Sequence, residues 1–307
     1  MEPQLRVAHI SKAYKSVQAL SDVNFEVGKG ELFGLIGPDG AGKTTLFRIL
    51  TTLILADSGK ATMNGWDVVK DYRKVRDNVG YMPGRFSLYQ TMTVEENLTF
   101  FARLFHTTID QNYDLVKDIY SQIEPFKDRM AGKLSGGMKQ KLALSCALIH
   151  RPLVLFLDEP TTGIDPVSRK ELWAMLRKLK EQDITIIVST PYMDEAMLCD
   201  RIGLIRKGQL LSVDTPQGII RQFKLKTYAV KADDMISALE DLRKMQEVKS
   251  SFTFGEYHHV TFVADDAARE GLAKLCETVL AKLKAAGHTH IEIREIPPTI
   301  EDCFMNW

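Results

Sequence analysis

Residues 37–45, with the sequence GPDGAGKTT, have the composition and spacing of a phosphate-binding loop. They fit the pattern G-x-x-x-x-G-K-[ST], in which successive backbone N–H groups surround phosphate oxygens. In this pattern Lys43 reaches the outer phosphates and the Thr44 hydroxyl binds magnesium. The candidate phosphate ligands are Gly37, Pro38, Asp39, Gly40, Ala41, Gly42, Lys43, Thr44 and Thr45.

The segments on either side of this loop predict how it is held. Residues 32–36 are mostly apolar and predict a strand, whereas Leu46, Ile49, Leu50 and Leu53 recur at helical spacing. A strand, a glycine-rich turn and a helix in succession place the helix N-terminus at the phosphates, where its dipole favours negative charge. In this context a solvated glycine-rich turn is the weaker interpretation.

A second chemical feature is an acidic pair that ends an apolar run at residues 153–157. The run predicts a parallel strand buried on both faces, and open α/β sheets bind ligands at the carboxyl ends of such strands. We expect Asp158 to hold magnesium, directly or through water, and Glu159 to act as the catalytic residue that orients or deprotonates a water. The alternative, a solvated acidic turn, is less favoured beside a phosphate loop.

Residues 134–140, LSGGMKQ, lie between these two segments. Ser135 is typical of a helix N-cap, and the amides of Gly136 and Gly137 at a helix start predict a second anion site. The segment resembles the signature loop of ATP-binding cassette (ABC) ATPases, and residues 160–166, PTTGIDP, are similar to the same family. This resemblance covers residues 5 to about 220 and is highly specific.

The resemblance implies a P-loop NTPase fold of the α/β class, with a mixed sheet core, an antiparallel β subdomain and a helical subdomain at about 85–150. It implies binding of ATP with Mg²⁺ between two cassettes. Ser135, Gly136 and Gly137 then meet the γ-phosphate held by the second cassette, and Asp165 lies at the dimer seam. Asp165 also fits a helix N-cap before a proline. Tyr14 lies where the family stacks an aromatic ring on adenine, with an exposed strand tyrosine as the alternative.

Two positions depart from the family pattern. After residues 79–83 the family usually has glutamine, and this chain has Gly84; after residues 188–190 it usually has histidine, and this chain has Pro191. Neither residue has a polar side chain. Losing one group that stabilises developing charge commonly costs about 2.7 to 4 kcal/mol of barrier, so hydrolysis at this chain's own site is expected to be slow. An asymmetric pair, in which residues 134–140 complete the site of a different cassette, is a further hypothesis.

Bulk composition excludes several classes of protein. The chain has 307 residues, long enough for a large domain and a smaller one, and 45% of them are hydrophobic. Its 40 basic and 40 acidic residues cancel, so a nucleic-acid partner is not expected. Four widely spaced cysteines predict reduced thiols in cytosol. No run of about 18 apolar residues occurs and no secretion signal is seen, which predicts a soluble chain that does not itself span a membrane. The resemblance to ABC ATPases implies a cytoplasmic location, peripheral on the cytoplasmic face of the cell membrane.

The pattern predicts a nucleotide-binding domain at residues 1–223 and an accessory α+β domain at 224–307. In the second domain the expected order βαββαβ is typical of a ferredoxin-like domain. His258 and His259 are neighbours in a predicted strand and point to opposite faces, so they are not expected to share a metal. The predicted strands are 225–231, 248–254, 258–264 and 289–295, and the predicted helices are 233–246 and 267–286.

The sequence thus predicts an ATP-binding and hydrolysing subunit of an ABC transporter. Residues 88–98 and 192–196 are similar to bacterial multidrug and efflux-type exporter ATPases. The expected partners are membrane-spanning permease subunits and a second cassette, either identical or different. Two alternatives stay open: a degenerate regulatory nucleotide-binding module, which Gly84 and Pro191 allow, and a soluble ABC ATPase outside transport. For the latter a second cassette, a coiled insertion or a basic face is expected, and none is visible.

Overall fold

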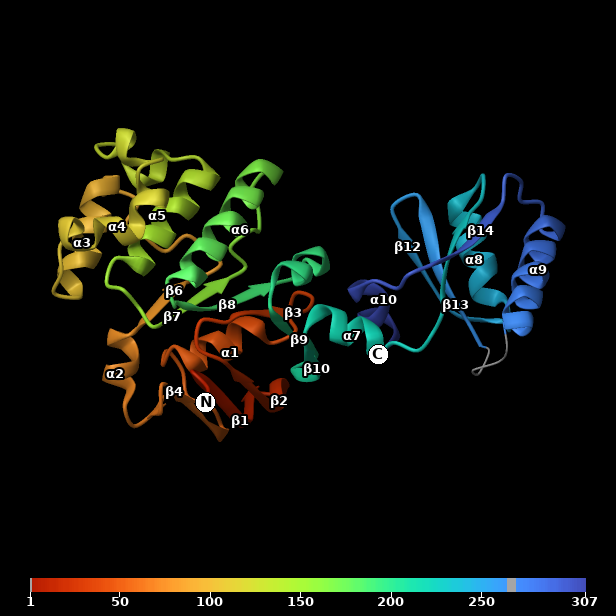
Figure 1. Cartoon of the computed structure of the whole chain (residues 1–307), viewed down its shortest axis with the longest axis horizontal. Helices are drawn as coiled ribbons and strands as arrows, with labels where there is room; N and C mark the ends of the chain where they lie inside the picture. The colour runs from red at the N-terminus through yellow and green to blue at the C-terminus, as the bar shows by residue number, and fades with distance from the viewer. Residues whose placement is uncertain (1, 264–268) are drawn as a thin grey trace. The chain divides into compact units, whose positions relative to one another are not determined.

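The computed structural model describes residues 2–263 and 269–307. The chain forms two compact units, Met1–Pro216 and Gln217–Trp307 (Figure 1). This boundary lies a few residues before residue 223, the predicted end of the first domain. The reason is that helix α7 (Pro216–Gln222) groups, apart from its first residue, with the second unit. Each unit has its own hydrophobic cluster.

A six-stranded sheet forms the centre of the first unit, in the order β10-β9-β3-β8-β7-β6. All neighbours are parallel except β9 and β10. Three central strands are buried along their whole length, as expected of apolar runs covered on both faces. Their carboxyl ends therefore meet at one edge. The strands are β3 (Leu32–Ile36), β6 (Val79–Met82), β7 (Val154–Asp158), β8 (Thr185–Thr190), β9 (Arg201–Arg206) and β10 (Gln209–Asp214).

An antiparallel sheet of order β2-β1-β4-β5 makes the second layer, which confirms the predicted β subdomain. Helix α1 (Lys43–Leu50) packs between the two sheets (Figure 1), and Phe47 meets Phe156 edge to face at 5.2 Å. The predicted face of this helix was one turn too long: Leu53 is 55% exposed, because Thr52 adopts left-handed backbone at φ 64° just past the helix end. The strands are β1 (Leu5–Tyr14), β2 (Val17–Val27), β4 (Ser58–Met63) and β5 (Trp66–Asp67).

Helices α3 (Val94–Leu104), α4 (Ile109–Tyr120) and α5 (Gly136–Leu148) gather at one end of this unit (Figure 1) and form the expected helical subdomain. A capping box begins α3, with the Thr93 hydroxyl accepting from Glu96 N at 3.1 Å and the Glu96 carboxylate from Thr93 N at 2.8 Å. Helix α2 (Tyr72–Asp77) precedes β6, and helix α6 (Pro166–Glu181) connects β7 to β8. A 3-10 segment η3 (Met193–Leu198) follows β8.

The second unit has the predicted βαββαβ order, and its sheet has the fully antiparallel order β12-β13-β11-β14. Helices on one face bury Leu242, Val279 and Leu283 against the strands. The first two residues of the predicted helix 267–286 lie outside the described residues. Helix α10 (Ile300–Asn306) was not expected from the sequence. The elements are β11 (Thr227–Lys231), α8 (Met235–Lys244), β12 (Val248–Phe254), β13 (Tyr257–Phe262), α9 (Arg269–Ala285) and β14 (Glu292–Ile296).

The two histidines of β13 have separate partners on opposite faces of the sheet. His258 Nε2 lies 2.6 Å from the Met235 carbonyl, and His259 Nδ1 lies 2.9 Å from Asp302 Oδ1. Among residues 2–263 and 269–307, no cluster of three or more metal-ligating side chains is found. Within the same residues, no helix combines the length and apolar character needed to cross a bilayer.

Candidate functional site

The phosphate loop runs from the end of β3 to the start of α1 and depends on close backbone approaches. Gly42 has φ 105°, and a Cβ there would lie 2.4 Å from the Ala19 carbonyl. At Gly37 a Cβ would lie 2.1 Å from the Ile205 carbonyl. Both positions therefore require glycine. Pro38, Asp39 and Gly40 are exposed at the tip of the loop, Ala41 is buried, and Thr44 and Thr45 are half-buried in the first turn of α1.

Lys43 is the first residue of α1 and is only 3% exposed. Its ammonium donates to the carbonyls of Gly37 at 2.8 Å and Pro38 at 3.0 Å, which holds the side chain folded over its own loop. The same nitrogen lies 3.2 Å from Glu159 Oε1. The structure therefore brings together the cation of the phosphate loop and the expected catalytic carboxylate.

The acidic pair lies at the carboxyl end of β7, as predicted. Asp158 is buried, and its Oδ1 accepts from the Ser189 hydroxyl of β8 at 2.6 Å. Glu159 has left-handed backbone at φ 51°, uncommon outside glycine. Its N–H donates to the Ser189 hydroxyl at 3.1 Å and to the Ser189 carbonyl at 3.0 Å, which fixes the turn that points Glu159 toward the phosphate loop. Burial, with a further contribution from Asp158, raises the pKa of nearby Tyr81 to about 12, so this phenol stays neutral.

The residues of the signature-like loop lie against α6. Ser135 caps α5, its hydroxyl accepting from Met138 N at 3.3 Å. Gly136 and Gly137 form the first turn of α5, and a Cβ on Gly137 would lie 2.8 Å from the Ser168 hydroxyl. The glycine thus permits close packing of the two helix starts. These three residues make their contacts with α5 and α6 in this chain, so the structure does not join them to Lys43.

Asp165 caps α6, as its sequence context predicts. Its Oδ1 accepts from Val167 N and Ser168 N, both at 3.0 Å, and its Oδ2 accepts from the Ser168 hydroxyl at 2.6 Å. These hydrogen bonds, led by that of the Ser168 hydroxyl, hold the pKa of Asp165 below its usual value. Tyr14 ends β1 and is 44% exposed, with the Lys12 ammonium 5.7 Å from its ring centroid.

Both positions that depart from the family pattern border the acidic pair and the phosphate loop. A Cβ at Gly84 would lie 3.0 Å from the Asp158 carbonyl and 3.8 Å from Glu159 Cβ. Pro191 directly follows Thr190, whose carbonyl accepts from the Gly37 N–H at 3.2 Å. A side chain at position 84 would therefore lie beside Asp158 and Glu159, and position 191 directly follows the residue bonded to the phosphate loop. This chain has no polar side chain at either position.

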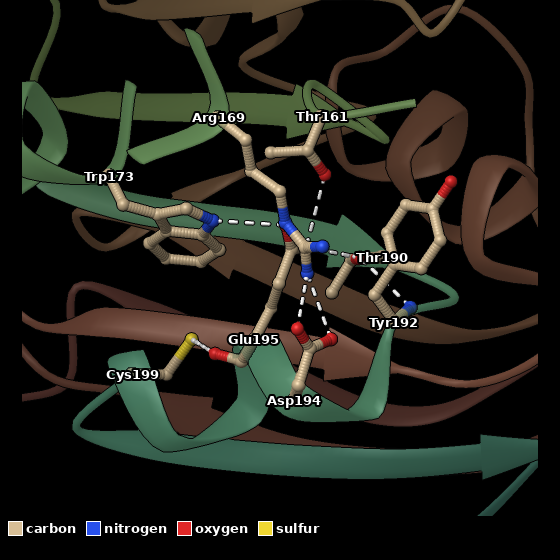
Figure 2. Close-up of polar contacts among 8 residues, drawn as sticks. All are labelled: Thr161, Arg169, Trp173, Thr190, Tyr192, Asp194, Glu195 and Cys199. Carbon is tan, nitrogen blue, oxygen red and sulfur yellow. Dashed lines mark hydrogen bonds and ion pairs between the residues drawn. The ribbon is translucent and has the colours of Figure 1, made fainter. Parts of the chain in front are cut away.

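Glu195 is a buried charged residue that the sequence pattern did not single out. It is 0% exposed, and four side chains donate to its carboxylate. Figure 2 shows that these donors come from α6, from the end of β8 and from the segment after β7. A charged residue in a short segment has no periodicity that reveals its burial, so only its partners distinguish it. The four donors are Thr161, Arg169, Trp173 and Thr190.

The chain is similar to several known proteins. The model of the family described as ABC transporter matches residues 20–162. A probable multidrug ABC transporter ATP-binding protein, YbhF of Escherichia coli (strain K12), is 38% identical over 224 residues, covering 72% of this chain and 39% of YbhF. The chain thus spans about two fifths of that relative. The Nod factor export ATP-binding protein I of Rhizobium sp. (strain N33) is 32% identical over 97% of this chain and 95% of its own length.

A third relative and two solved structures extend the comparison. The daunorubicin resistance ATP-binding protein DrrA2 of Streptomyces coeruleorubidus is 40% identical, covering 70% of this chain and 68% of DrrA2. A structure described as the ATP-binding subunit of an ABC transporter superposes with a TM-score of 0.66 at 28% identity, covering 72% of this chain and 93% of that chain. The dimeric bacterial cassette MJ0796, 23% identical, shares the fold with a TM-score of 0.63, covering 69% and 98%. The expected ABC ATPase fold is confirmed, and the chain belongs to the ABC transporter family as one of its ATP-binding proteins.

Proposed function

We propose that this chain hydrolyses Mg²⁺-ATP to drive export through separate membrane-spanning permease subunits, working at the cytoplasmic face of the membrane. The observation that carries the proposal is the meeting of Lys43 with Glu159, 3.2 Å apart at the carboxyl edge of the sheet. The relatives named for multidrug transport, daunorubicin resistance and Nod factor export support export. Because those names differ in what is transported, they support no particular substrate. They also do not favour a soluble ABC ATPase outside transport.

The proposed roles follow from donor chemistry. The backbone of residues 37–45 and the Lys43 ammonium bind the phosphates, and the exposed Tyr14 ring stacks on the adenine. The Thr44 hydroxyl and the Asp158 carboxylate hold Mg²⁺, which prefers oxygen ligands. Asp158 suits this role because Ser189 occupies Oδ1 and no hydrogen bond is seen at Oδ2 among the described residues. When bound, Mg²⁺ neutralises part of the phosphate charge.

Glu159 is the proposed general base. Its carboxylate is held over the phosphate loop by a backbone turn and is 23% exposed, so a water can reach it. An ATP γ-phosphate competes with Glu159 for the Lys43 ammonium, because both are anions. Binding of ATP therefore frees the Glu159 carboxylate to accept a proton from the attacking water.

A second cassette completes the proposed site. Ser135 and the amides of Gly136 and Gly137 lie at a helix start, where they suit an anion carried by another chain. Gly84 and Pro191 leave this chain's own site without two polar groups, which supports slow hydrolysis and an asymmetric pair with a different cassette. A homodimer that hydrolyses ATP briskly would contradict the asymmetric pair.

The test uses the purified full chain, with nucleotide binding and phosphate release measured separately. We expect Glu159→Gln to keep ATP affinity and to lower turnover by about a hundredfold or more, the usual contribution of a general base. It should also stabilise an ATP-bound dimer, seen as faster sedimentation with ATP. The matched control is Glu181→Gln, an exposed glutamate at the end of α6. Equal turnover in the two variants would refute the role of Glu159.

A further inference from the structure

Glu195 occupies a position that is expensive for a charged group. Its side chain is 0% exposed, and removing a carboxylate from water costs several kcal/mol unless it is paired and hydrogen-bonded. Lys43, Asp158 and Glu159 make no contact with this carboxylate among the hydrogen bonds and ion pairs of the described residues. Its burial therefore calls for a role outside phosphate and metal binding.

The two carboxylate oxygens of Glu195 face different parts of the first unit (Figure 2). Oε1 accepts from Arg169 Nε at 2.6 Å and from Trp173 Nε1 at 3.1 Å, both on α6. Oε2 accepts from the Thr161 hydroxyl at 3.1 Å and from the Thr190 hydroxyl. One side chain thus joins the first turns of α6 to the segments that follow β7 and end β8.

Each threonine is close in the chain to the proposed hydrolysis site. Thr161 lies two residues after Glu159, and the Thr190 carbonyl accepts from Gly37 N of the phosphate loop at 3.2 Å. Thr190 also accepts from Tyr192 N at 3.1 Å through its hydroxyl, which fixes the turn around Pro191. Glu195 therefore accepts hydrogen bonds from two segments that lead to the site.

The other end of the connection is the part of α6 next to Asp165. Arg169 lies one turn beyond this cap, and its backbone N–H donates to the Asp165 carbonyl at 2.9 Å. The Arg169 guanidinium also donates to both carboxylate oxygens of Asp194 at 2.8 Å and lies 4.8 Å from the Tyr192 ring. Arg169 thus ties the start of α6 to the Glu195 carboxylate.

We propose that Glu195 is a positioning residue for ATP hydrolysis, which couples the start of α6 to the Thr161 and Thr190 segments beside the hydrolysis site. This inference rests on the proposed ATPase function. In this proposal the buried Glu195 carboxylate positions the segment around Pro191, whose own side chain has no polar group. A displacement of the α6 start next to Asp165 then moves the Thr161 and Thr190 segments through Glu195.

Hydrogen-bond chemistry predicts how a glutamine would behave at this position. A carboxylate offers about four acceptor sites, which match its four donors. Arg169 and Trp173 only donate, so the amide oxygen of Glu195→Gln must take the Oε1 place and the NH₂ group must face the two threonines. In the native chain the Thr190 hydroxyl donates to Glu195 and accepts from Tyr192 N. In the variant it would have to accept from the glutamine amide as well. The variant keeps the shape of the side chain while changing the hydroxyl orientations and removing the charge that holds Arg169.

The experiment compares Glu195→Gln with wild type in steady-state ATPase assays of the full chain. We expect kcat to fall about tenfold or more while KM for ATP changes less than twofold, because the phosphate ligands are untouched. Thr190→Val should lower kcat similarly, Thr190→Ser should restore most of it, and Glu195→Gln combined with Thr190→Val should lose little more. Glu181→Gln on the same helix is the control. Full kcat in folded Glu195→Gln would overturn the proposal.

Trp173 gives a second, spectroscopic readout, because its indole donates to Glu195. With Trp66 and Trp307 replaced by phenylalanine, ATP should change the Trp173 emission in the otherwise native chain and not in Glu195→Gln. An unchanged ATP response in Glu195→Gln would overturn the coupling even if kcat fell. A native chain with no more turnover than Glu159→Gln would overturn both the ATPase function and this inference, whereas loss of the inference alone leaves native turnover intact.

Discussion

Replacing Arg169 by methionine should strongly destabilise the first unit, because it leaves a buried charge without its cation. Glu195 is 0% exposed, and its contact with Arg169 Nε is 2.6 Å long. Breaking a buried ion pair from one side costs about 3 to 5 kcal/mol. The remaining donors, Thr161, Thr190 and Trp173, are neutral and replace only part of this stabilisation. We therefore expect Arg169→Met to lower the free energy of unfolding by about 3 kcal/mol.

The same helix supplies a matched control. Lys178 pairs with Asp118 at 2.9 Å, but the two side chains are 62% and 60% exposed. Such surface pairs contribute about 0 to 1 kcal/mol, so Lys178→Met should change the stability little. Both variants remove one cation from α6 and replace it by the same apolar side chain, which leaves burial of the partner as the main difference.

Urea unfolding followed by Trp173 emission in the Trp66→Phe, Trp307→Phe background reports on the first unit separately from the second. Adding Glu195→Gln to Arg169→Met should recover a large part of the loss, because the uncompensated charge is gone. If Arg169→Met and Lys178→Met differ by less than about 1 kcal/mol, the assignment of a costly buried charge is refuted.

Three further predictions concern pH, the loop glycines and the altered positions. Burial lowers the pKa of His150 to about 4, below its unfolded value of 6.5. The unfolded chain therefore binds the proton first, and the free energy of unfolding should fall by up to about 3 kcal/mol between pH 6.5 and pH 4. The free energy of unfolding, measured by chemical denaturation across this range, should depend less steeply on pH in His150→Phe than in the native chain. An equally steep dependence in the variant would count against this role of His150. Gly42→Ala should abolish ATP binding, measured by equilibrium dialysis, because its Cβ meets a carbonyl at 2.4 Å. Gly40 is also at positive φ, but a Cβ there would have no atom within 4 Å, so Gly40→Ala should cost only about 1 to 2 kcal/mol of backbone strain. An equal loss of ATP binding in the two variants would contradict the steric argument. Gly84→Gln combined with Pro191→His should raise kcat by about tenfold or more over Gly84→Ala, since each restored group is worth up to a hundredfold or more. No gain would show that these positions do not limit hydrolysis.

Much of the candidate site was predictable because its features are local. The phosphate loop and the cap at Asp165 each depend on residues within about one helical turn. The run before Asp158 identified a buried parallel strand by its lack of alternation. The order of elements in the second unit followed from the same short-range periodicity.

Errors and omissions arose where the exact end of a helix or a contact between distant segments decides the outcome. The face predicted for α1 extended to Leu53, which is exposed beyond the helix end. Helix α10 has too few residues for a periodic pattern, although its Asp302 accepts from the Thr299 hydroxyl and meets His259. These contacts depend on where β13 and α10 meet, which short-range patterns do not specify.

The sequence by itself determined the class of chemistry, because the glycines, Lys43 and the acidic pair form recognisable local patterns. Only the tertiary structure decided that Glu159 lies 3.2 Å from Lys43 and that Glu195 is a buried connection between α6 and the end of β8. The physical reason is the register of the parallel sheet, which pairs Ile36 with Thr190 and Asp158 with Ser189. That register is set by the packing of whole strands, so it brings side chains together across segments that share no local signal.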